Sequence, residues 1–77
     1  MYIVPPILCY AVFIYDRTRH NIAEVSKAGY ELCKAEPGDD RGSNGYDVFT
    51  LAKGLNYFIS TMPGDCEAGI KLNVTAS

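Results

Sequence analysis

Short runs of β-branched and aromatic residues, separated by turn-forming residues, recur along most of the chain. Residues 12–15 read Val-Phe-Ile-Tyr and end at the polar segment 16–19, while residues 20–25 form a second extended run. Such residues fit the half-buried surface of a sheet, so both runs are predicted to be strands. In the second run, Ile22 and Ala23 are expected to face opposite sides of the sheet.

A short helix is predicted between the second strand and a long surface loop. Ser26 can cap a helix over residues 27–34, although Gly29 lowers the stability of that helix by about 1 kcal/mol relative to Ala. Cys33 would then lie near the helix end. Residues 36–45 are dense in turn formers and charge, and this pattern predicts a mobile surface loop.

The second half of the chain predicts three more strands. Residues 47–51 largely alternate polar and apolar side chains, residues 56–60 are aromatic and β-branched, and a glycine turn between them predicts a hairpin. Residues 71–75 form the last strand, with Leu72 and Val74 inward. Short strands at regular spacing, with Gly and Pro turns, are typical of an antiparallel sandwich, so the predicted fold class is all-β.

The first ten residues are apolar but show no sign of a signal peptide or membrane anchor. They lack a basic start, are interrupted by Pro5 and Pro6, and contain no small-residue cleavage site. The apolar run 1–15 is shorter than the roughly 20 residues that a bilayer requires, and its prolines would break a helix. No transmembrane span is expected.

Size and charge exclude several classes of function. With 77 residues and a net charge of −2, the chain has room for one domain and no basic face for nucleic acid or anionic lipid. We therefore expect neither partner. A chain this short buries roughly 60 to 65% of its unfolded surface, so its stability is marginal without a covalent staple.

The three cysteines, Cys9, Cys33 and Cys66, form an odd set. In an extracellular chain, an odd count indicates one disulfide and one leftover thiol. Three reduced, buried thiols in a cytosolic protein are the alternative, which the spacing disfavours because it suits neither a CxxC redox pair nor a zinc site.

Residues 57–66, with residues 19–21 upstream and residues 68–72 downstream, resemble the C-terminal part of a phytocyanin, a member of the plant blue-copper family. The resemblance covers residues 11–75 and rests on an ordered set of positions: Phe13, Ile14, Tyr15, Asp16, His20, Asn21, Ile22, Tyr30, Cys33, Gly45, Leu51, Gly54, Tyr57, Phe58, Ile59, Pro63, Gly64, Cys66, Gly69, Lys71 and Leu72. It implies a partial cupredoxin-like Greek-key sandwich with one short helix and one disulfide. Residues 1–10 would be a non-family apolar leader on a chain truncated at its N-terminus.

The same resemblance assigns four positions to the copper site of the family. His20 matches the first histidine ligand, and it is the one ligand retained. Ser60 stands in the thiolate position, Asp65 in that of the second histidine, and Ile70 in that of the weak axial ligand. A blue-copper centre needs a thiolate and two imidazoles, so we expect no copper and no other cofactor. Weak binding of Zn²⁺ or Cu²⁺ by His20 and Asp65 is the alternative.

Two covalent modifications are expected. Cys33 and Cys66 match the paired cysteines of the family, so the resemblance implies a disulfide between them. Closing a loop of that length would stabilise the fold by about 3 to 4 kcal/mol in the chain-entropy model. Residues 73–75 form an Asn-Val-Thr sequon, which predicts glycosylation of Asn73 if the chain is secreted.

Ser60, His20 and Asp65 are also the residue types of a nucleophilic triad. A triad needs an oxyanion hole and a nucleophile within reach of its base, whereas Ser60 ends a strand without a Gly-x-Ser-x-Gly context. The chain is therefore not expected to be an enzyme.

The set of lost ligands is similar to that of the early nodulin-like branch of the phytocyanins, whose members lack copper ligands and lie at the outer face of the plasma membrane. This resemblance implies an extracellular or plasma-membrane, copper-free module that binds an unknown cell-surface or wall component or has a structural role. Blue-copper electron transfer, the default activity of the family, and a non-functional truncated product are the alternatives. Because early strands of the family are missing, self-association through open sheet edges is also expected.

Overall fold

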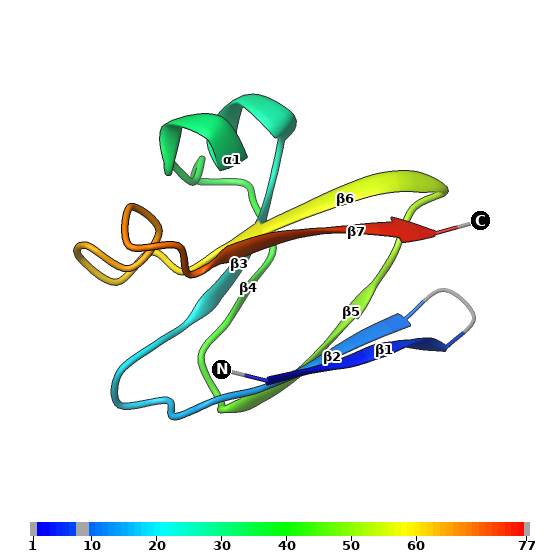
Figure 1. Cartoon of the computed structure of the whole chain (residues 1–77), viewed down its shortest axis with the longest axis horizontal. Coiled ribbons are helices and arrows are strands. Elements are labelled where there is room, and N and C mark those ends of the chain that lie inside the picture. Colours follow the sequence, from blue (N-terminus) through cyan, green and yellow to red (C-terminus); the bar gives the residue numbers. More distant parts are fainter. Residues whose placement is uncertain (1, 8–9, 77) are drawn as a thin grey trace.

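Two antiparallel β-sheets packed against each other form the body of the computed structural model, which describes residues 2–7 and 10–76 (Figure 1). The elements in chain order are β1 (Tyr2–Ile7), β2 (Tyr10–Ile14), β3 (Ile22–Val25), α1 (Lys27–Leu32), β4 (Arg41–Gly42), β5 (Tyr46–Thr50), β6 (Gly54–Ile59) and β7 (Lys71–Ala76). The expectation of an all-β fold with one short helix is confirmed for this part of the chain.

Sheet A contains the strands β1, β2 and β5 in that order. β2 pairs antiparallel with β5, and this register places Val12 opposite Val48 and Phe13 opposite Asp47. β1 pairs antiparallel with the other edge of β2. The segment that the sequence suggested as an apolar leader therefore supplies an edge strand of this sheet. Cys9, the expected leftover thiol, lies outside the described residues.

Sheet B contains β4, β3, β6 and β7 in that order. β3 pairs antiparallel with β6, with Ala23 opposite Ile59, and β6 pairs along its whole length with β7. β4 has two residues and pairs with β3 through Gly42 and Ile22. It interrupts the segment 36–45, which the sequence predicted as a loop throughout.

The predicted hairpin between residues 47–51 and 56–60 is wrong. β5 pairs with β2 in sheet A, whereas β6 pairs with β3 and β7 in sheet B, so the connection between them crosses from one sheet to the other. Phe49 of β5 and Phe58 of β6 consequently meet across the core instead of lying in one sheet. A glycine between two apolar runs fits either connection, and packing across the core decides between them.

Three phenylalanines fill the space between the two sheets. Phe13 of sheet A packs against Phe58 of sheet B with 4.8 Å between ring centroids, and both rings are fully buried. Phe49 meets these two rings edge-on at 5.7 and 5.2 Å, an arrangement that aromatic rings prefer. Val74 belongs to the same core and Leu72 packs against it, so the predicted inward face of the last strand is confirmed.

The helix covers the outer face of sheet B (Figure 1). Ser26 caps its first turn, as predicted, because the side-chain oxygen accepts a backbone N–H bond. The helix ends at Leu32, two residues earlier than predicted, because Cys33 adopts a left-handed C-cap conformation with φ 55°. Ile22 faces the core and Ala23 faces the cluster under the helix, so their opposite orientation is confirmed. No helix in the described ranges is long and apolar enough to cross a membrane.

Candidate functional site

The four positions assigned to the copper site of the family lie at one end of the sandwich. His20 lies just before β3, Ser60 follows β6 directly, and Asp65 lies in the connection to β7. The carbonyl of Ile70 accepts the N–H of Ser60 at 3.1 Å, and the N–H of Ile70 donates to the carbonyl of Asp65 at 2.9 Å. The structure therefore brings all four positions together, with Ile70 held through its backbone. We call residues 61–69 the site loop.

One carboxylate oxygen of Asp65 joins two of these side chains. Its Oδ2 lies 2.7 Å from Nδ1 of His20 and 2.7 Å from Oγ of Ser60. Ser60 is 1% exposed, and the side chains of His20 and Asp65 are 19% and 20% exposed. The three groups form a partly shielded polar cluster at the end of the apolar core.

These hydrogen bonds favour the ionised form of the Asp65 carboxyl. The bond to His20, followed by the bond from Ser60, lowers the pKa of the Asp65 carboxyl below its ordinary value. An ionised carboxylate can only accept hydrogen bonds, so Nδ1 of His20 carries a proton and the hydroxyl of Ser60 donates. A protonated Nδ1 cannot ligate a metal, which leaves only Nε2 of His20 for that purpose.

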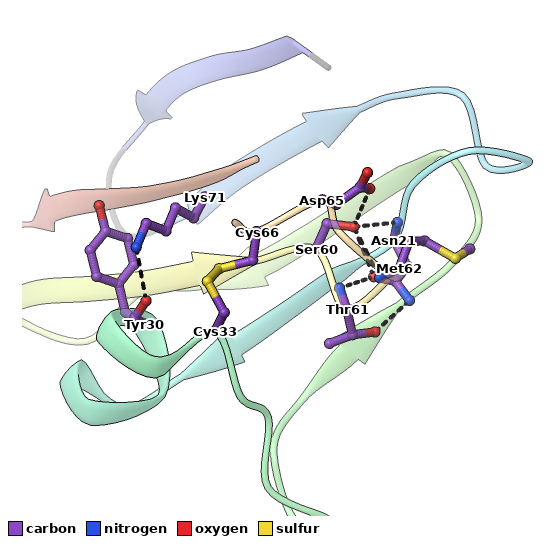
Figure 2. Close-up of a disulfide and its surroundings, with 9 residues drawn as sticks. All are labelled: Asn21, Tyr30, Cys33, Ser60, Thr61, Met62, Asp65, Cys66 and Lys71. Carbon is purple, nitrogen blue, oxygen red and sulfur yellow. Dashed lines mark hydrogen bonds between the residues drawn. A yellow bond between two sulfur atoms is a disulfide. The ribbon is translucent and has the colours of Figure 1, made fainter. Parts of the chain in front are cut away.

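Asn21 and Thr61 form a second pair that fastens the same end of the molecule (Figure 2). Oδ1 of Asn21 accepts the backbone N–H of Thr61 at 2.6 Å, and Nδ2 of Asn21 donates to Oγ1 of Thr61 at 2.7 Å. The two residues lie 40 positions apart in the sequence. This pair ties the segment before β3 to the start of the site loop.

A disulfide between Cys33 and Cys66 anchors the site loop on the helix side (Figure 2). The Cα atoms of the two cysteines are 5.5 Å apart, and Cys66 is buried. The expectation of one disulfide is confirmed. Beside it, the ammonium group of Lys71 lies 4.6 Å from the ring centroid of Tyr30 and donates to the Tyr30 carbonyl at 3.2 Å. The end of α1, the site loop and β7 are thereby held together.

Sequence reasoning assigned no role to Asn21 or Thr61. Asn21 follows the retained histidine directly, but no local pattern pairs it with a residue 40 positions away. That partner becomes visible only when the pairing of β3 with β6 is known. Asn73, the predicted glycosylation site, lies away from the site and is exposed on β7, which is an edge strand of sheet B.

Ser60 and His20 are not arranged as a nucleophile and its general base. In a catalytic triad the hydroxyl bonds to the imidazole, and the carboxylate orients the imidazole from its far side. Here the hydroxyl of Ser60 and the imidazole of His20 both bond to the same oxygen of Asp65. The hydroxyl of Ser60 is therefore paired with a carboxylate and has no imidazole to activate it.

The donor set does not fit a blue-copper centre. Such a centre requires a thiolate and two imidazoles, whereas this end of the protein offers one imidazole, one carboxylate and one hydroxyl. The sulfur atoms of Cys33 and Cys66 are bonded to each other. Among the side chains that the structure describes, no three His, Cys, Asp or Glu residues are grouped so that they could hold a metal ion.

Comparison with known sequences gives close matches. The Plastocyanin-like domain family matches residues 9–70. A chemocyanin from Lilium longiflorum is 44% identical over 86% of this chain and 52% of that protein. Early nodulin-like protein 22 from Arabidopsis thaliana is 43% identical over 83% of this chain and 46% of that protein. The chain thus spans about half the length of these two relatives.

The fold also matches a solved structure. Spinach plantacyanin superimposes with a TM-score of 0.85 and 35% sequence identity, over 96% of this chain and 82% of that chain. The two-sheet sandwich, the short helix and the disulfide were also expected from the residues that resemble this family. The chain belongs to the phytocyanins, within the Plastocyanin-like domain family.

Proposed function

We propose that this phytocyanin domain works without copper, as an extracellular or plasma-membrane module that binds a cell-surface or wall component or has a structural role. One observation carries the copper-free part of the proposal. At the end of the sandwich where the family places its copper ligands, His20, Ser60 and Asp65 are hydrogen-bonded to one another. Nδ1 of His20, Oγ of Ser60 and Oδ2 of Asp65 therefore already have hydrogen-bond partners within the protein.

The energetics of these contacts oppose a metal. Ligation by Asp65 through Oδ2 would compete with two hydrogen bonds of 2.7 Å, one of them from a serine that is 1% exposed. Hydrogen bonds to a charged group are worth about 1.5 to 3 kcal/mol each. If these hydrogen bonds were broken, the metal would gain one carboxylate ligand. It would gain no thiolate, which is the ligand that selects copper in this family of sites. Electron transfer through a blue-copper centre therefore has no supporting observation in these residues.

Two features support a location outside the cytosol. The disulfide between Cys33 and Cys66 is of a kind that persists in oxidising compartments. Asn73 of the sequon is exposed on an edge strand, where a glycan would meet no core residue. The similarity to an early nodulin-like protein supports the same assignment, because that name belongs to the branch whose ligand pattern this chain resembles.

The copper-free part is tested by titrating the folded, oxidised chain with Cu(II) while recording the visible spectrum. We expect no intense charge-transfer band at any ratio, since that band arises from a copper–thiolate bond and Ser60 supplies an alcohol. An intense blue colour that saturates at one copper per chain would overturn the proposal. Cucumber basic protein, a blue copper protein that this chain resembles in fold, is freed of metal and treated identically as the positive control.

The binding part is tested by incubating the labelled chain with isolated plant cell walls and measuring its depletion from solution. A binding module should be depleted in a saturable manner. The reduced and alkylated chain, which cannot form the disulfide between Cys33 and Cys66, is the control for adhesion of unfolded protein. Equal or absent depletion of both forms would contradict a wall-binding role.

A further inference from the structure

The outward face of sheet A is apolar and exposed. Its members point away from the core residues with which they alternate, as the pleat of a strand requires. We call this surface the sheet A face, and it consists of Tyr10, Val12 and Ile14 of β2 and Tyr46, Val48 and Thr50 of β5. The strand register pairs these residues with one another: Val12 with Val48, Ile14 with Tyr46, and Tyr10 with Thr50. The six side chains thus form one contiguous patch.

The exposure of this patch is high for its residue types. Tyr46 is 62% exposed, Val48 53%, Tyr10 47% and Ile14 39%. These are four of the six large apolar residues that are exposed in the described chain. The sheet A face carries no charged side chain.

The two sheets differ in how their outer faces are covered. The outer face of sheet B is covered by α1 and the disulfide, which pack on Ala23, Val25 and Ile59. Figure 1 shows that no helix covers the far side of β2 and β5 in the described part of the chain. The sheet A face is therefore the side on which this domain has apolar surface left to bury.

The area of the patch agrees with a weak, reversible interface. A fully exposed aromatic side chain presents roughly 200 Å² and an aliphatic one somewhat less, so the exposures above amount to roughly 400 to 500 Å². Two such patches together reach about 800 to 1,000 Å², which is at the lower limit for a specific protein interface. A permanent dimer would need about twice that area.

We propose that the sheet A face packs against the same face of a second copy of this chain, across a two-fold axis. Two sheet faces can pack about 10 Å apart with interdigitating side chains, and a two-fold axis uses one patch twice. Val12 and Val48 occupy the centre of the patch, and the tyrosines lie at diagonal corners where their hydroxyl groups can stay hydrated. Without charges to select a complementary surface, the patch fits an equally apolar one, and a second copy supplies it.

The test measures the sedimentation velocity of the oxidised chain over a hundredfold concentration range. Free thiols are first alkylated without reduction, so that no intermolecular disulfide forms. We expect a reversible monomer–dimer equilibrium. Val48→Lys places a charge at the centre of the proposed interface and should raise the dissociation constant of the dimer about tenfold or more. Leu55→Lys is the matched control, since Leu55 is 55% exposed on β6 outside the patch, and it should leave the equilibrium unchanged.

Circular dichroism verifies that each variant folds, and Tyr46→Ser replaces Val48→Lys if that variant does not. Amide shifts on dilution should change at β2 and β5. A chain that is monomeric throughout the range, or a dimer that Leu55→Lys weakens as much as the patch variant does, would overturn the proposal. So would an association whose amide shifts map to β4 or β7, because that result would indicate pairing at the edges of sheet B.

Discussion

Asp65 stands at the position that the resemblance assigns to the second histidine of the copper site, and its contacts give it a different role. A carboxylate at this point satisfies a buried hydroxyl and a half-buried imidazole through a single oxygen atom. Each partner would be costly to leave unpaired at these depths. The side chains of Ser60 and Asp65 therefore complement each other, and the polar cluster that they form with His20 stabilises the end of the sandwich.

The pH dependence of stability should reveal this role of Asp65. Its pKa is lowered in the folded chain, so the stabilisation is present above the unfolded value of about 3.9 and is lost as the pH falls through the lower folded pKa. We expect Asp65→Asn to lower the melting temperature at neutral pH, and we expect this difference from the native chain to shrink progressively as the pH falls below about 4 and through the lower folded pKa. Glu67→Gln, an exposed residue on the same loop, is the control and should show no such convergence. A deficit that is constant from pH 7 to pH 2 would contradict the assigned hydrogen bonds.

Restoring the missing ligands tests whether the four positions still converge on one point. The triple variant Ser60→Cys, Asp65→His and Ile70→Met returns a thiolate, an imidazole and a thioether to the surroundings of His20. With Cu(II) it should develop an intense blue absorption band, because the backbone around Ser60 and Ile70 is held by hydrogen bonds.

The matched control for that variant carries Ala in place of Cys at position 60, with the other two changes kept. It differs only in the thiolate and should stay colourless or nearly so with copper. If the well-folded triple variant also binds copper without blue colour, the alignment of these four positions with the copper ligands of the family is wrong.

At the scale of elements, a buried hydrogen bond fastens the end of β2 to β5. The hydroxyl of Tyr15 donates to Asp47, and the two residues are only 9% and 8% exposed. Burial, followed by the bond to Asp47, raises the pKa of Tyr15 to about 12. The sequence pattern did not predict this pair. Asp47 alternates with Phe49 and Leu51 on the inward face of the strand, where the pattern predicts apolar side chains.

Tyr15→Phe should lower the free energy of unfolding by about 1 to 3 kcal/mol, since it leaves the buried carboxylate of Asp47 with only the 3.4 Å hydrogen bonds from Asn44. Tyr46→Phe is the control, because Tyr46 is 62% exposed on the neighbouring strand, and its effect should stay within about 0.5 kcal/mol. Urea denaturation at pH 7 measures both. For the native chain, the stabilisation from Tyr15 is present below pH 10 and should be lost as the pH rises through about 12.

The type of each element could largely be predicted from the sequence. The strand with which each strand pairs was harder to predict. The alternation in residues 71–75 predicted the inward side chains of β7, and Ser26 predicted the start of α1, because both signals act within a few residues. The pairing of β5 depends on packing across the core, which no local pattern encodes. The same limit applies to the site: the residue types at His20, Ser60 and Asp65 were recognised from sequence, but their arrangement around one oxygen atom depends on distant strands meeting.

For the whole molecule, the disulfide between Cys33 and Cys66 is a large contribution to stability that substitution can remove. It joins positions 33 residues apart, and closing such a loop is worth about 3 to 4 kcal/mol in the chain-entropy model. The double variant Cys33→Ser, Cys66→Ser should therefore unfold at markedly lower urea concentration and be partly unfolded at 37 °C. Cys9→Ser is the control. A double variant as stable as the native chain would show that the core alone suffices.

The contact between His20 and Asp65 has a consequence for the kinetics of folding. It joins positions 45 residues apart, one before β3 and one after β6, so we expect it to form together with or after the pairing of these two strands. Contacts between such distant positions are slow to form, because a long loop must close first. The chain contains one histidine. The imidazole proton resonances of that single residue should therefore report when β3 and β6 come together, and NMR can follow them without any label.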